Sequence, residues 1–194
     1  AEEKKLEQEY LPEEITEKDV KKSWLTYYFF AETGISYERL QALGFCMSLI
    51  PIFKKLYKKK EDFTAALKRH MVFYNTEAVF GSVINGITIA MEEQKAKGAP
   101  IDDETITSVK SGLMGPMAGV GDSLDWATFK PIIFALGATL SAQGSPIGCF
   151  VLLLLPIIQM IIGTNFAAFG YRKGRSSVRS ILGSGKIQQL LTAA

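Results

Sequence analysis

The sequence predicts an all-α, polytopic membrane protein that combines amphipathic helices with broken or re-entrant helices. Apolar residues recur at helical spacing along most of the chain, and no segment shows strand-like alternation. Residues 131–170 contain no charged residue, although the 194-residue chain has 22 Lys and Arg and 20 Asp and Glu. Most of the charge therefore lies in residues 1–110, and the second half carries the signal for a membrane.

The composition excludes several classes of function. A net charge of +2 gives no global attraction for nucleic acid. The two cysteines, Cys46 and Cys149, stand in separate apolar stretches without metal or redox spacing, so we expect both to be reduced and to serve in packing. Residues 1–10 carry no secretory-signal pattern. We expect no metal and no cofactor.

Two helices are predicted first. Thr16 suits the N-cap of a helix over residues 17–30. One face of that helix carries an aromatic stripe, which we interpret as packing or as a membrane-interface belt: Trp24, Tyr27 and Tyr28. Residues 36–60 predict a second helix, with a kink at Pro51 and a basic end at 54–60.

Three further helical segments follow. Residues 61–74 are amphipathic and contain His70, the only histidine, beside Arg69. We expect His70 at a surface position and not as a phosphate carrier. The polar Asn75 and Thr76 lead into an apolar run, which predicts a membrane-embedded segment near 75–92. A short helix at 101–115 would be capped by Asp102 or Asp103.

The apolar segments near the end of the sequence indicate whether the protein lies in water or in a membrane. Residues 145–171 exceed the roughly 20 apolar residues that span a bilayer, and the basic run 172–175 that follows indicates a cytoplasmic end. Residues 131–142 reach only about half that length, which favours a re-entrant or broken helix. The alternative is a buried core helix of a soluble protein, although core helices seldom run so long without a charge.

Between these parts lies the stretch "GLMGPMAGVGDSLDW" at 112–126. We expect no uninterrupted helix here, with the preceding helix ending at Pro116. Asp122 would cap the next helix, contact a ligand, or do both, and Asp125 would lie in the first turn of that helix. Transporters often build substrate sites from such broken helices. The Lys-Ser/Thr ending of a phosphate loop is absent.

The chain is interpreted as one integrated domain with two parts. Residues 1–110 would hold the amphipathic helices and the embedded segment. Residues 111–194 would hold the glycine-rich broken-helix site and the transmembrane region.

Four segments together resemble the IID subunit of the mannose/fructose/sorbose family of the bacterial sugar phosphotransferase system: 38–57, 73–102, 109–132 and 185–190. The resemblance extends over about 16–189. It implies one half of a sugar permease in the bacterial cytoplasmic membrane, paired with a IIC subunit, with higher oligomers of IIC–IID pairs. A cytoplasmic IIA–IIB phosphocarrier would phosphorylate the incoming mannose-type hexose, so this chain itself would carry no catalytic or phosphorylated residue.

The resemblance also implies a site. Substrate would contact Asn75, Thr76 and Asp122, while the backbone geometry would depend on glycines. These site glycines are Gly115, Gly119 and Gly121. Members of the family continue past residue 190 with further apolar segments, so the C-terminal part of the pattern is missing here and the number of spans stays open. Two alternatives are a non-transporting membrane scaffold that stabilises its partner and a surface receptor for bacteriocin peptides.

Overall fold

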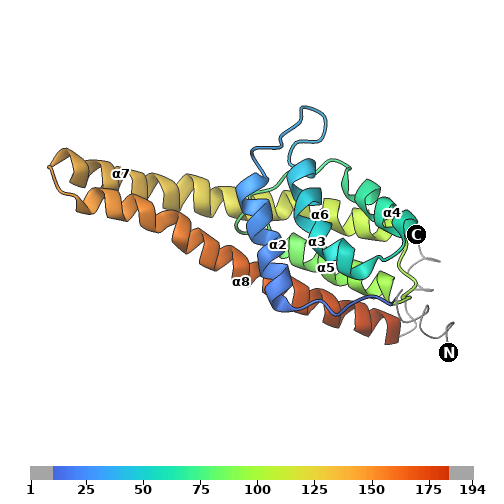
Figure 1. The fold of residues 1–194 in the computed structure, drawn as a ribbon. Coiled ribbons are helices and arrows are strands. Elements are labelled where there is room, and N and C mark those ends of the chain that lie inside the picture. Colours follow the sequence, from blue (N-terminus) through green and yellow to red (C-terminus); the bar gives the residue numbers. More distant parts are fainter. Residues whose placement is uncertain (1–10, 184–194) are drawn as a thin grey trace.

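A computed structural model describes residues 11–183, with side chains up to residue 177, and every regular element in this range is a helix (Figure 1). A helical body is joined to a long hairpin that extends away from it. The helices of the body are α2 (Glu17–Phe30), α3 (Ala42–Leu56), α4 (Lys60–His70), α5 (Ser82–Ala96) and α6 (Asp103–Gly121). The hairpin follows through η1 (Asp122–Phe129), α7 (Lys130–Ala142) and α8 (Ile147–Gly183), whose last part returns to the body.

The first helix begins and packs as the sequence predicts. The Thr16 hydroxyl accepts a hydrogen bond from the Asp19 N–H, and the Asp19 carboxylate accepts one from the Thr16 N–H, which completes a capping box. Trp24 and Tyr27 are fully buried in the core, and the Trp24 indole donates to the Ala78 carbonyl. The packing interpretation of the aromatic stripe is therefore confirmed for these two residues.

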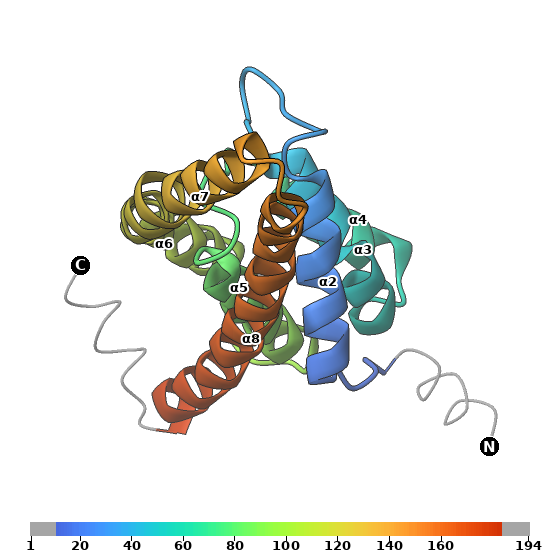
Figure 2. The ribbon, with the colours of Figure 1, turned by 90° about the vertical axis from the view of Figure 1, so that its left-hand side faces the viewer.

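Helix α8 crosses the body between α2 and α5 (Figure 2). The approach to α5 is close because glycines face the partner backbone. A Cβ added at Gly86 would lie 2.0 Å from the Ala167 carbonyl oxygen, and one at Gly170 would lie 2.2 Å from the Val83 carbonyl oxygen. Among the described helices, α5 and α8 share the most extensive contact, so this glycine-lined crossing anchors the hairpin to the body.

The predicted break at 112–126 is wrong. Helix α6 continues through Pro116 to Gly121, the π-helix η1 follows at once, and α7 continues from it without a gap. In η1 the chain widens instead of breaking: the Lys130 N–H donates to the carbonyl of Asp125, five residues earlier. The wider π turn thus takes up the irregularity that we expected to appear as two helix ends. The predicted boundary at 110–111 falls inside α6, and the division into two parts stays a prediction.

Residues 131–142 lie in α7, which continues from η1 without a break and runs antiparallel to α8 (Figure 1). The predicted broken helix is therefore wrong here, and a re-entrant course in the membrane stays a prediction. The turn between them places Gly144 at a φ of 75°, a conformation that favours glycine. Within residues 11–183, one stretch is long and apolar enough to cross a membrane, Ile147–Ser177. Only 22% of its apolar window is buried, whereas a soluble core helix would be mostly buried.

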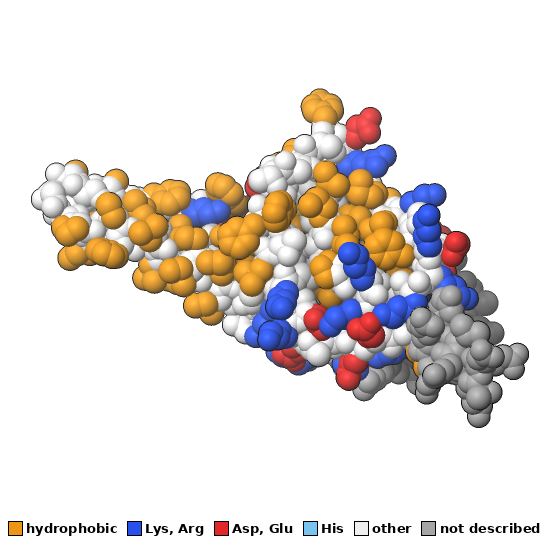
Figure 3. Space-filling view, viewed as in Figure 1, with side chains coloured by type: hydrophobic (Ala, Val, Ile, Leu, Met, Phe, Trp, Pro, Cys, Tyr) orange, Lys and Arg blue, Asp and Glu red, His pale blue; other side chains and the backbone are white. Residues whose placement is uncertain are grey.

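The surface divides by chemistry. On the face shown in Figure 3, hydrophobic side chains cover the hairpin and the adjoining part of the body, whereas most Lys, Arg, Asp and Glu side chains lie on the part of the body far from the hairpin tip. The predicted embedded segment at 75–92 corresponds to a turn and most of α5, which packs inside the body. Its placement in a membrane stays a prediction.

Candidate functional site

A cavity of about 500 Å³ opens where η1 passes the end of α2 and the middle of α8. The turn before α5 and the last part of α6 complete its walls. Its polar lining comes from side chains far apart in the sequence: Tyr28, Glu32, Gln41, Asn75, Thr76, Glu77, Asp122, Asp125, Lys130 and Gln159. Pockets that bind small molecules usually combine such convergent polar groups with apolar walls.

All three predicted contact residues line this cavity: Asn75, Thr76 and Asp122. Asn75 and Asp122 are exposed. Thr76 is buried, its hydroxyl donates to the Met114 carbonyl at 3.3 Å, and its N–H donates to the Gln41 side chain at 3.1 Å. The structure thus brings together residues 46 positions apart, while their contact with a sugar stays a prediction.

Asp122 does not cap a helix. An N-cap residue has non-helical backbone angles, whereas Asp122 has φ −62° and ψ −38° in the middle of a continuous helical path. The capping role is therefore a wrong prediction, and the reason is the π-helix that joins α6 to α7. The carboxylate of Asp122 is left free to face the cavity.

The predicted site glycines fall into two groups. Gly121 is buried against Glu77, whose Oε2 would lie 2.4 Å from an added Cβ. The Glu77 carboxylate accepts hydrogen bonds from the N–H groups of Val79 and Phe80, at 2.8 and 2.7 Å. Gly121 therefore lets a carboxylate that shapes the turn before α5 approach the helix. An added Cβ at Gly115 or Gly119 would meet no atom within 4 Å, so their backbone faces open space.

A polar chain links α2, α8 and η1 along one wall, and the sequence did not reveal it. The Tyr28 hydroxyl donates to Gln159 Oε1 at 2.9 Å, and Gln159 Nε2 donates to Asp125 Oδ1 at 2.6 Å. The Lys130 ammonium lies 2.8 Å from Asp125 Oδ2. One signal was present: Gln159 is an amide inside the charge-free run, and polar residues in such segments usually have a function.

An aromatic side chain adjoins this chain of polar groups. The Lys130 ammonium lies 3.3 Å from the centre of the Trp126 ring, a cation–π contact, and Trp126 remains 60% exposed. Carboxylates, amides and a hydroxyl can exchange hydrogen bonds with a ligand that carries several hydroxyl groups, since each hydroxyl both donates and accepts. The wall therefore suits an uncharged polyhydroxyl ligand.

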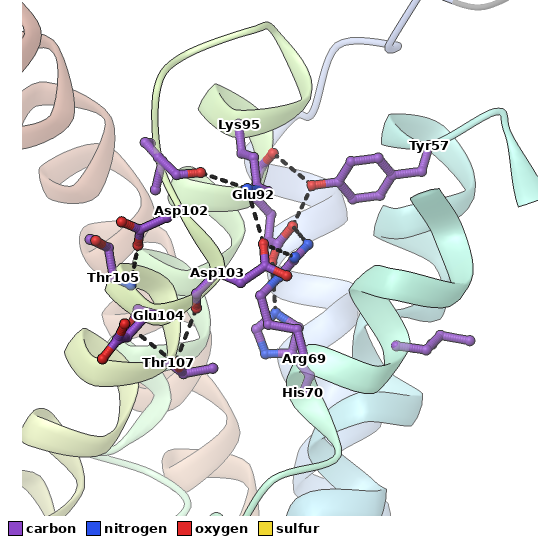
Figure 4. A network of polar contacts seen from close by, with 12 residues as sticks. Tyr57, Arg69, His70, Glu92, Lys95, Asp102, Asp103, Glu104, Thr105 and Thr107 are labelled. Atoms are coloured by element: carbon purple, nitrogen blue, oxygen red, sulfur yellow. Dashed lines mark hydrogen bonds and ion pairs between the residues drawn. The ribbon is translucent and has the colours of Figure 1, made fainter. Parts of the chain in front are cut away.

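A second polar cluster lies buried between α4, α5 and α6 (Figure 4). Arg69 donates to both oxygens of Glu92, at 2.8 and 3.0 Å, and Glu92 also contacts Tyr57. Asp103, in the first turn of α6, forms ion pairs with Arg69 and, at 3.0 Å, with Lys95. This cluster ties the beginning of α6 to the body and lies apart from the cavity.

His70 belongs to this buried cluster, so the predicted surface position is wrong. Its side chain is 0% exposed and its Nε2 lies 2.8 Å from Glu92 Oε1. Burial lowers the pKa of His70, so the neutral ring donates its Nε2–H to the Glu92 carboxylate. The adjacent basic residues suggested a solvated face, but Glu92 on another helix draws both Arg69 and His70 inside.

Within residues 11–183, no group of three or more His, Cys, Asp or Glu side chains is placed to hold a metal ion. Cys46 is buried and Cys149 is exposed, and both thiols are free.

Comparison with known proteins gives consistent matches over most of the chain. Residues 14–194 match the family model of the PTS system mannose/fructose/sorbose family IID component. The chain is 42% identical over 183 residues to the sorbose-specific EIID component of Lacticaseibacillus casei, covering 94% of this chain and 64% of the relative. It is 38% identical over 182 residues to the mannose-specific EIID component of Escherichia coli K12, covering 93% and 64%. The chain therefore spans less than two thirds of the length of these relatives.

The fold is also similar to solved structures. A cryo-EM structure of the mannose transporter ManYZ in complex with microcin E492 contains a chain that superposes with a TM-score of 0.80 at 35% identity, covering 92% of this chain and 69% of that one. A second structure, described as a membrane protein, superposes with a TM-score of 0.77 at 38% identity and covers 94% and 67%.

Proposed function

This chain belongs to the mannose/fructose/sorbose IID family of phosphotransferase-system components, and on that premise we propose that it is the IID half of a membrane sugar permease. Together with a IIC subunit it forms the path through which a mannose-type hexose enters and is phosphorylated. The sorbose- and mannose-specific relatives and the structural likeness to a chain of the ManYZ transporter complex support this proposal.

The position of the cavity along α8 is the observation that carries the proposal. Gln159 lies 12 residues from Ile147 and 12 from Tyr171, which is about 18 Å of helix on each side. The hydrocarbon core of a bilayer is about 30 Å thick, so a spanning α8 places the cavity near the midplane. Transporters bind their substrates at this depth, beside irregular helices.

The same geometry supports a membrane-embedded hairpin. Helix α8 spans, α7 accompanies it for part of the depth, and the polar cavity accommodates Asp122 and Asp125 away from lipid. The basic residues Arg172 and Lys173 follow the charge-free part of α8 and indicate that this end is cytoplasmic. In this proposal the protein is polytopic in the bacterial cytoplasmic membrane, as part of a higher oligomer of IIC–IID pairs.

Phosphoryl transfer belongs to the partner proteins. His70 is buried and bonded to Glu92, so it is shielded from an incoming phosphocarrier. The ion pair between Arg172 and Glu17, at 2.9 Å, joins the last part of α8 to the start of α2. Basic side chains at this end of the body would dock the IIA–IIB phosphocarrier or the anionic inner leaflet.

Alternating access would move this unit against the IIC subunit, with the sugar site between them. The open backbone faces of Gly115 and Gly119 would allow close approach of the IIC chain. No metal or cofactor takes part in this scheme, and nucleic acid is not a partner.

One substitution tests the site. The chain is co-expressed with its IIC subunit, the complex is purified in detergent, and mannose affinity is measured by calorimetry. We expect Asp122→Asn to leave the yield of complex unchanged, because the side chain is exposed and caps no helix. The variant should bind mannose more weakly, because it loses a charged hydrogen bond, and each 1.4 kcal/mol of lost binding free energy lowers the affinity roughly tenfold.

The matched control is Asp62→Asn, an exposed aspartate in the first turn of α4 outside the cavity, which should bind mannose as the wild type does. Unchanged affinity in Asp122→Asn would remove Asp122 from the site and leave Asn75 and Thr76. A wild-type complex that assembles and binds no hexose would refute the proposed function.

A receptor for antibacterial peptides is a second candidate function, since the ManYZ complex with a similar chain contains microcin E492. A cell that expresses the IIC–IID pair should then become sensitive to a microcin of this kind. A chain that only stabilises its IIC partner would instead tolerate substitution of every cavity residue.

A further inference from the structure

The cavity wall is strongly acidic. Its carboxyl groups come from the loop after α2, the turn before α5, and η1, whereas Lys130 supplies the single basic side chain in the lining. These carboxyl groups are Glu32, Glu77, Asp122 and Asp125. Even without Glu77, whose two oxygens are engaged by backbone N–H groups, carboxylates outnumber the ammonium by three to one.

The one cation is already engaged. Lys130 lies between the Asp125 carboxylate, at 2.8 Å, and the Trp126 ring, at 3.3 Å. Asp125 is itself buried, with 4% of its side chain exposed; its Oδ1 accepts from Gln159 and its Oδ2 is paired with the Lys130 ammonium. The pairing with Asp125 occupies the one ammonium of the cavity lining, so this wall offers an anionic ligand no free cation to bind.

The backbone offers no anion site either. Anions bind at helix N-termini, where free N–H groups point outward. Along this wall α6, η1 and α7 form one continuous helical path, so the described residues present no N-terminus there. Near α5, the N–H groups of Val79 and Phe80 already donate to Glu77.

We propose that this carboxylate wall selects the uncharged sugar and excludes the phosphorylated sugar. The inference rests on the proposed function and deepens it. A phosphomonoester carries close to two negative charges at neutral pH, so the product of the reaction meets a wall that stays negative although Lys130 offsets one of its carboxylates, whereas the neutral substrate meets hydrogen-bond acceptors. Rebinding of product is thereby suppressed, and uptake becomes directional at the site itself.

The test uses the purified IIC–IID complex without the phosphocarrier. Mannose and mannose 6-phosphate are titrated separately by calorimetry at low and at high salt. We expect mannose 6-phosphate to bind at least about 100-fold more weakly than mannose at low salt, and this ratio to shrink as salt screens the wall. Mannose affinity itself should change little with salt, because mannose carries no charge.

A charge-removing variant adds an independent measurement. Glu32 is exposed, and its Oε1 accepts from the Gln41 amide at 2.9 Å, a contact that glutamine retains. Glu32→Gln should narrow the affinity ratio between the two ligands by roughly tenfold. Glu38→Gln removes an exposed carboxylate from the same loop but outside the cavity, and it should leave the ratio unchanged.

The outcomes separate the two levels of the proposal. An assembled complex that binds neither ligand refutes the proposed function and this inference with it. Mannose binding with equal affinity for mannose 6-phosphate leaves the permease intact and overturns the inference alone. A ratio that is insensitive both to salt and to Glu32→Gln also overturns it, even where the phosphorylated sugar binds weakly.

Discussion

At the scale of single residues, His70 shows how distant partners determine a side chain's role. Its burial depends on Glu92, 22 positions away on another helix, and the sequence around His70 contains only basic and apolar neighbours. The local sequence could therefore argue against a phosphate-carrying role for His70, but it could not predict that the imidazole ring is buried. The Asp125–Gln159 contact, across 34 positions, escaped prediction for the same reason.

Replacing His70 should not stop transport. Glutamine places an amide N–H close to the position of the imidazole Nε2–H, so His70→Gln can still donate to Glu92. We expect phosphoenolpyruvate-driven sugar uptake per assembled complex to remain within about twofold of wild type. Uptake that disappears while the amount of assembled complex stays normal would show that His70 takes part in the chemistry.

Burial of Lys110 should make the free energy of unfolding depend on pH. Its side chain is 1% exposed, with the ammonium 5.4 Å from the centre of the Phe45 ring and 5.6 Å from that of Tyr74. Burial lowers the pKa of Lys110 from 10.5 to about 8. The unfolded chain therefore binds this proton more tightly than the folded one, and the protein gains stability as pH rises from about 8 to 10.5.

Lys110→Met removes this titration. We expect the variant to be more stable than wild type at pH 7, and its advantage to fall by about 2–3 kcal/mol between pH 8 and pH 10.5. Thermal unfolding in detergent across this pH range measures the difference in stability between the variant and the wild type. The other titratable groups contribute equally to both proteins, so they do not affect this difference. A difference that does not vary with pH would contradict the assignment.

At the scale of helices, local signals determined where elements begin, and tertiary contacts determined how they continue. The caps at Thr16 and Asp102 were predictable because capping depends on adjacent residues. The apolar span was predictable from composition. The continuity of α6, η1 and α7 was not, because Gly and Pro weaken a helix locally, while the packing of α6 against α4 and α5 and of α7 against α8 decides whether the path breaks.

The α5–α8 crossing predicts a contrast between two glycines. Gly86→Ala would force a methyl group to within 2.0 Å of the Ala167 carbonyl oxygen, so we expect a loss of about 1–3 kcal/mol in stability. Gly112→Ala meets no atom within 4 Å and should be neutral or stabilise α6 by up to about 1 kcal/mol. The melting temperature of each variant is compared with that of the wild type. Equal shifts in the two variants would contradict the close approach of α5 and α8.

At the scale of the whole molecule, polar and apolar surfaces lie at opposite ends. The hairpin carries exposed Phe134, Phe150 and Leu153, whereas charged side chains gather at the far end of the body (Figure 3). Such an extended apolar surface exceeds what soluble monomers expose, so it requires lipid or a partner chain. The proposed permease provides both.

Membrane association follows directly from this surface. After an alkaline carbonate wash of membranes from expressing cells, we expect the chain to stay in the pellet, because burial of the hairpin in lipid does not depend on charge. A charged peripheral protein from the same cells serves as the control and should be released. Recovery of the chain in the supernatant would favour the soluble core-helix alternative.

The proposed function requires the sugar to occupy the cavity at η1, and protection of a cysteine in the cavity lining by bound sugar tests this occupancy. Asn75→Cys is introduced together with Cys149→Ser, since Cys149 is the exposed native thiol and Cys46 is buried. The rate of maleimide labelling of this chain in the IIC–IID complex is measured with and without saturating mannose, with Thr33→Cys outside the cavity as the control. We predict that mannose slows labelling of the Asn75→Cys chain and leaves the control unchanged. Equal rates with and without mannose, in a complex that binds it, would place the sugar elsewhere and contradict the account.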